Sequence, residues 1–70
     1  MLEAAKTLLV HSLTQELRLR ESEAVHLSNT ADRLHHQGQP AMAQAVWNMW
    51  RHNEVEVMKL RTAVVALDCQ

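Results

Sequence analysis

Residues 41 to 67 constrain the fold of this chain most, because they are apolar on two sides of a single helix. At 100° of rotation per residue, one side of that helix collects eight apolar residues, namely Met42, Ala45, Val46, Met49, Leu60, Ala63, Val64 and Leu67. The other side collects Trp47, Trp50, Val57, Met58 and Val65. One stripe can pack against the rest of a small chain, and the second stripe then needs a further partner.

The first half of the chain carries one apolar stripe with spacings of three, four or seven residues, which predicts a helix over residues 2–36. Its members are Leu2, Ala5, Leu9, Leu13, Leu17, Ala24, Leu27, Ala31 and Leu34. Arg20 falls near the middle of this stripe, one turn from Glu16 and from Glu23, either of which could pair with it. Two readings stay open: an arginine that extends its charged end into water, or a member of an interface ion pair.

The only break in the helical pattern is the segment Gln37-Gly38-Gln39-Pro40. Glycine is favoured just after the end of a helix, and proline is favoured in the first turn of the next one. Such a short connection predicts an all-α chain of two long antiparallel helices that form an αα-hairpin. We expect one domain over residues 1–70, with a helix at 2–36, a turn at 37–40 and a helix at 41–67.

The register of this hairpin follows from its turn. Leu34 should approach Met42 and Ala45, and Leu27 should approach Met49. Near the other end, Leu13 or Leu17 should lie close to Leu60 and Ala63. The first stripe of the second helix is therefore expected to form the core with the stripe of the first helix.

The chain has 70 residues, which is too few for a large core. Its single cysteine, Cys69, cannot form an intrachain disulfide, and no Cys or His spacing matches a structural zinc site. Association with another polypeptide is therefore the expected source of added stability.

Charge and hydropathy argue against two other classes of partner. Seven Lys and Arg balance eight Asp and Glu, so no basic field is available for nucleic acid. The apolar run Leu8-Leu9-Val10 is too short for a membrane span and lacks the cleavage site of a signal peptide. A cytoplasmic protein is expected.

The sequence offers little support for catalysis, a cofactor or a metal. His35 and His36 fall at the end of the first helix, where they can interact with its last carbonyl groups. His26 and His52 lie at similar heights in the predicted hairpin, but no third ligand joins them. A helical hairpin also provides no enclosed pocket for a nucleophile.

The surplus stripe is the predicted binding site for a partner protein. Tryptophan is enriched among the residues that anchor protein interfaces, and methionine suits an adaptable contact surface. We therefore expect a partner to bind Trp47, Trp50, Val57, Met58 and Val65.

A long helix, a short turn with Gly38, and a second helix with Trp47 nine residues later resemble the YscE-type co-chaperones of type III secretion systems. The resemblance implies a small two-helix protein without enzymatic activity in the bacterial cytoplasm. It implies as partner a TPR-like chaperone that holds the needle subunit. Through that chaperone the hairpin would help to keep a filament-forming subunit soluble.

Two other functions remain open at this stage. Two hairpins could bury the same stripe against each other and form a homodimeric four-helix bundle. Alternatively, the chain could be a secretion needle or rod subunit, since these are also short helical hairpins.

Overall fold

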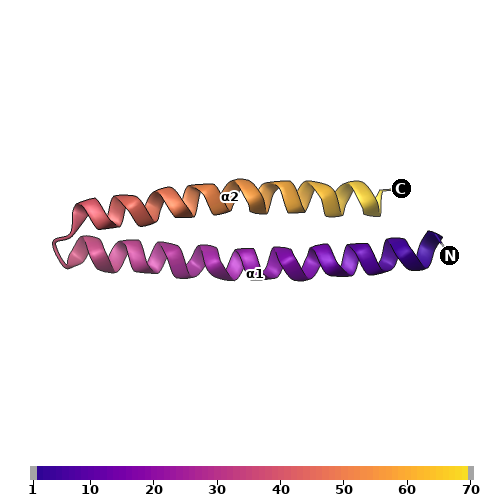
Figure 1. Cartoon of the computed structure of the whole chain (residues 1–70), viewed down its shortest axis with the longest axis horizontal. Helices are drawn as coiled ribbons and strands as arrows, with labels where there is room; N and C mark the ends of the chain where they lie inside the picture. The colour runs from indigo at the N-terminus through magenta and orange to yellow at the C-terminus, as the bar shows by residue number, and fades with distance from the viewer. Residues whose placement is uncertain (1, 70) are drawn as a thin grey trace.

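The computed structural model describes residues 2–69 and contains two long helices, α1 (Leu2–His36) and α2 (Pro40–Asp68). Figure 1 shows them side by side and antiparallel, with both termini at the end away from the turn. The Cα atoms extend over 56 × 14 × 12 Å, so the molecule is a rod only two helices wide. The predicted all-α hairpin is confirmed.

The turn ends α1 through backbone hydrogen bonds. The N–H of Gln39 donates to the carbonyl of Leu34 at 2.9 Å, and the N–H of Gly38 donates to the carbonyl of His35 at 3.1 Å. This pair of bonds is the Schellman motif, which needs a residue with positive φ. Gly38 supplies it with φ of 75°, and Pro40 then opens α2.

The two helices meet along a seam of buried and half-buried residues at alternating spacings of three and four. This spacing is the heptad pattern of a two-stranded coiled coil. On α1 the seam comprises Lys6, Val10, Leu13, Leu17, Arg20, Ala24, Leu27, Ala31 and Leu34. On α2 it comprises Ala43, Val46, Trp50, Asn53, Val57, Leu60, Val64 and Leu67.

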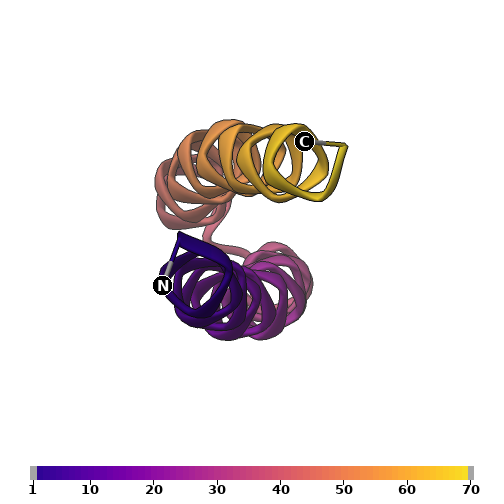
Figure 2. The same cartoon turned by 90° about the vertical axis from the view of Figure 1, so that its right-hand side faces the viewer.

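The register of the seam is fixed by Arg20 and Asn53, which hydrogen-bond to each other across it. Because both helices rise by the same distance per residue, seam residues that precede Arg20 on α1 lie beside seam residues that follow Asn53 on α2, and the reverse holds toward the turn. The end-on view shows the two helices shifting sideways in opposite directions along their length, as expected when two helices wind around each other (Figure 2).

The seam corrects the expected division of α2 into two faces. Met42, Ala45 and Met49 were expected in the core, but they are exposed. Val57 was expected on the free face, but it is packed inside the hairpin with 1% of its surface exposed. Trp47 and Trp50 are half-buried.

On α1 the correction is confined to the N-terminal third. Leu2, Ala5 and Leu9 are exposed, while Lys6 and Val10 occupy the seam in their place. The remaining members of the expected stripe on this helix are buried or half-buried as predicted, from Leu13 to Leu34.

Candidate protein interaction surface

One flank of the hairpin carries large apolar residues at seven-residue spacing. Leu9 on α1, and Met42 and Met49 on α2, each precede a seam residue by one position, and Leu2 lies seven residues before Leu9; all four are exposed. We call this side the methionine flank. In an antiparallel pair of helices, residues at this heptad position lie on the same side of the seam.

An open groove crosses the methionine flank near the middle of the rod. Leu27 and Met49 give it an apolar floor, and its volume is about 430 Å³. Its polar lining comprises Arg20, Glu23, Asn48, His52 and Asn53. Leu27 and Met49 therefore line one groove, but Met49 is 57% exposed and does not pack in the core as expected.

A second hollow lies at the open end of the rod. Leu2, Ala5 and Leu9 of α1 line it together with Leu67 of α2, and Glu3 and Lys6 stand at its edge. The methionine flank thus presents two recesses: a groove with an apolar floor and a polar rim, and a more apolar hollow at the open end of the rod. A partner helix laid along this flank would find apolar contacts at both ends.

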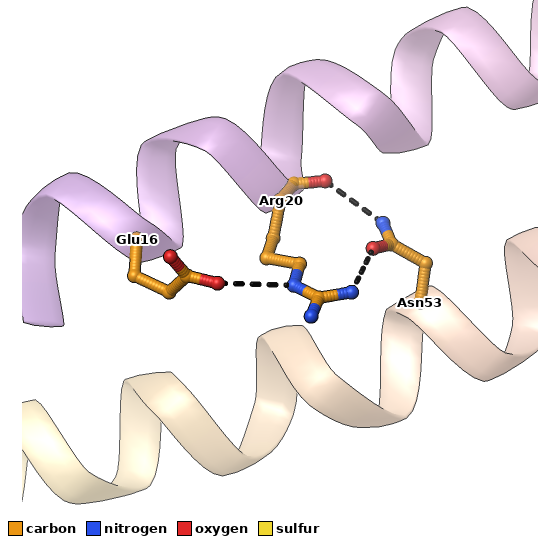
Figure 3. A network of polar contacts seen from close by, with 3 residues as sticks. All are labelled: Glu16, Arg20 and Asn53. Carbon is orange, nitrogen blue, oxygen red and sulfur yellow. Dashed lines mark hydrogen bonds and ion pairs between the residues drawn. The ribbon is translucent and has the colours of Figure 1, made fainter.

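A charged section near the middle of the rod is organised by Arg20, as Figure 3 shows. Its Nε donates to Oε1 of Glu16 at 3.4 Å, and its Nη1 donates to Oδ1 of Asn53 at 3.4 Å. In return, Nδ2 of Asn53 donates to the backbone carbonyl of Arg20 at 2.8 Å. Of the two predicted acidic neighbours, Glu16 makes the ion pair, and Glu23 lines the groove instead.

Asn53 is the residue of this section that the apolar pattern of the sequence did not predict. It is a polar side chain with only 4% of its surface exposed. A signal was present: Asn53 follows Trp50 by three residues and precedes Val57 by four, as a seam residue does.

The opposite flank of the hairpin is held by polar and aromatic contacts. Nη2 of Arg61 donates to Oε2 of Glu21 at 3.1 Å, which links the two helices. Trp47 stands beside the seam at the corresponding heptad position of α2. One ion pair between α1 and α2 therefore spans this flank.

The five residues predicted to bind a partner do not form one surface. Val57 is enclosed by the hairpin, and Trp50 is a seam residue. Met58 and Val65 lie outside the seam, with 64% and 60% of their surfaces exposed, on the side away from the methionine flank. The surplus stripe is therefore only partly exposed, because Met58 and Val65 are free while Val57 is enclosed.

Residues 2–69 contain no group of three or more His, Cys, Asp or Glu side chains that could hold a metal ion. The rings of His35 and His36 lie at the end of α1 with centroids 6.1 Å apart and planes tilted by 57°, and Cys69 is an exposed free thiol. Neither helix contains a stretch apolar enough, and long enough, to cross a membrane within these residues.

Comparisons with known proteins give no relative for this chain: no family model, no curated protein and no solved structure matches it.

Proposed function

We propose that this protein is a non-enzymatic interaction module whose methionine flank is covered by another polypeptide. The observation that carries the proposal is the exposure of Leu2, Leu9, Met42 and Met49 along one side of a two-helix rod. These residues form two clusters, one toward each end of the rod, and exposed apolar clusters are typical of protein interaction sites. Methionine in particular suits a surface that adapts to its partner.

The size of the exposed surface supports the same proposal. The chain has an accessible surface of 5379 Å² for a mass of 8.0 kDa. A compact monomer of that mass would expose about 4,450 Å². The surplus of about 900 Å² matches the roughly 800 Å² that each partner contributes to a stable interface.

The most specific form of the proposal rests on the resemblance to YscE-type co-chaperones. On this basis the chain acts in the bacterial cytoplasm and stabilises a TPR-like chaperone that holds the needle subunit of a type III secretion system. An apolar helical flank is the type of surface that a groove in a helical-repeat protein accepts. Folding and binding would then be linked, because a partner that binds only the folded hairpin stabilises it.

The proposal is tested by reconstitution with a TPR-like chaperone from the same host. The binding variant combines Met42→Gln with Met49→Gln, and the matched control is Met58→Gln, since glutamine is close to methionine in length. We expect the binding variant to lose at least tenfold in affinity by calorimetry, while the control binds like the native chain. Both should retain native helicity.

Two results would contradict the proposal. The first is a native chain that stays monomeric at high concentration and binds no chaperone. The second is equal loss of affinity in the binding variant and in Met58→Gln, which would mean that the methionine flank has no special role. A tight homodimer that the chaperone does not displace would favour the four-helix bundle instead.

A further inference from the structure

A polar layer interrupts the seam at the middle of the hairpin. Asn53 is buried and uses both ends of its amide on Arg20: the nitrogen donates to the backbone carbonyl at 2.8 Å, and the oxygen accepts from Nη1 at 3.4 Å. Among residues 2–69 no buried side-chain nitrogen or oxygen atom lacks a hydrogen-bond partner. The layer is thus fully satisfied when α1 packs on α2 (Figure 3).

A buried polar layer is generally less stabilising than a layer of well-packed apolar residues. Replacement of buried polar or ionic groups by well-packed apolar residues of similar size is often stabilising. A single polar residue at a core position of a coiled coil typically specifies partner and alignment at the expense of stability. Arg20 and Asn53 are therefore candidates for residues that determine which helices pair with each other.

The position of Arg20 on α1 supports this role. The seam residues at its heptad position are Lys6, Leu13, Arg20, Leu27 and Leu34, and Arg20 is the central one. If α1 paired in parallel and in register with α1 of a second chain, Arg20 would lie opposite Arg20, and in an antiparallel pair over Leu2–His36 the two arginines would lie within one helical turn of each other. Two guanidinium groups would then face each other in the seam, where like charges are costly.

We infer that the layer formed by Arg20 and Asn53 specifies the pairing of α1 with α2 and disfavours the pairing of α1 with α1 of a second chain. Arg20 disfavours the α1–α1 pair. In the hairpin its guanidinium donates to the amide of Asn53, whereas in a pair of α1 helices it would lie near the Arg20 guanidinium of the other chain. Asn53 provides the complement, because its amide satisfies the carbonyl and the guanidinium of Arg20 at once. The short turn favours closure at low concentration, and the layer acts when chains are concentrated enough to pair with one another.

The experiment compares three variants in a parent chain that carries Leu9→Glu and Met42→Glu, so that association through the methionine flank does not contribute. The variants are Arg20→Leu, Asn53→Leu and the double variant. Molar mass is measured by light scattering from about 5 µM to about 5 mM, a range that spans the millimolar-scale effective concentration of a tethered helix. Thermal unfolding is followed by circular dichroism.

The inference predicts a difference between the two single variants. Arg20→Leu and the double variant should form additional species of at least twice the parent mass, whereas Asn53→Leu should keep the parent mass because Arg20 is still present. The double variant should melt about 5 to 15 °C higher than the parent, and Asn53→Leu should melt lower. Leu13→Ile with Leu60→Ile, which leaves the polar layer intact, should keep the parent mass.

Three results would overturn the inference. Parent-like masses in both Arg20→Leu and the double variant would show that Arg20 excludes nothing. Additional masses in Asn53→Leu would show that loss of any seam polar group has the same effect. A lower melting temperature for the double variant would show that the layer is a net source of stability. None of these results depends on whether the methionine flank binds a chaperone.

Discussion

The indole rings of Trp47 and Trp50 meet edge to face, with ring centroids 5.6 Å apart and an interplanar angle of 86°. Edge-to-face contact is a favourable geometry for aromatic pairs. Trp50 belongs to the seam and Trp47 stands beside it, so each indole covers part of the other. The hairpin thus shelters a large part of both rings without a partner.

This arrangement predicts different roles for the two tryptophans. Trp50→Ala should lower the free energy of unfolding by about 2 to 4 kcal/mol, because it leaves a space in the seam. Trp47→Ala should cost clearly less, since that ring lies at the edge of the seam. Urea unfolding followed by circular dichroism measures both values, and equal losses would contradict the placement of Trp50 in the seam.

The turn gives a second prediction, which concerns backbone conformation alone. Gly38 has φ of 75°, and a Cβ atom added there would meet nothing within 4 Å. Gly38→Ala should therefore destabilise the hairpin by about 1 to 2 kcal/mol. The cost arises because alanine disfavours the left-handed backbone conformation, and not because its Cβ atom clashes with a neighbour. Gly38→Asn should cost less, because asparagine tolerates this conformation better. A thermal melt in which both variants match the native chain would refute this explanation.

The ion pair between Arg61 and Glu21 should contribute little to stability. The two side chains are 58% and 46% exposed, and exposed ion pairs are generally worth about 0 to 1 kcal/mol. We expect Glu21→Gln to change the free energy of unfolding by less than about 1 kcal/mol, and the difference to vanish in high salt. A larger loss that persists in salt would assign this pair a structural role.

The sequence was sufficient to predict the hairpin, because its turn chemistry is unambiguous. Glycine and proline occur once each, two residues apart, between two long helical patterns. The Schellman motif forms at that glycine, and α2 begins at that proline. Both helix boundaries near the turn lie within one residue of their predicted positions.

The face of α2 could not be read correctly at 100° per residue, because the helices wind around each other. A straight helix drifts by about 20° per heptad relative to a seam that repeats every 3.5 residues. Between Ala43 and Val64 the accumulated drift is about 60°. The seam therefore lies between the two predicted stripes near the turn, where it takes in Trp50, and coincides with the first stripe near Leu67.

The candidate surface was predicted less well for the same reason. The sequence correctly indicated that α2 has more apolar residues than α1 can cover, but it assigned the surplus to the wrong side near the turn. Met42 and Met49 moved out of the expected core, and Val57 moved into it. The central polar layer was half predicted: Arg20 was recognised as a seam residue, whereas its partner on the other helix was not.

The neighbouring residues Val57 and Met58 provide the sharpest test of the corrected face. Val57 is 1% exposed and Met58 is 64% exposed, although the uncorrected pattern places both on one free stripe. Val57→Ala removes two buried methyl groups and should lower the free energy of unfolding by about 2 kcal/mol. Met58→Ala should change it by less than about 0.5 kcal/mol, as is usual for exposed positions. Chemical unfolding of the two variants in parallel measures the difference, and similar values for both would restore the original division of faces.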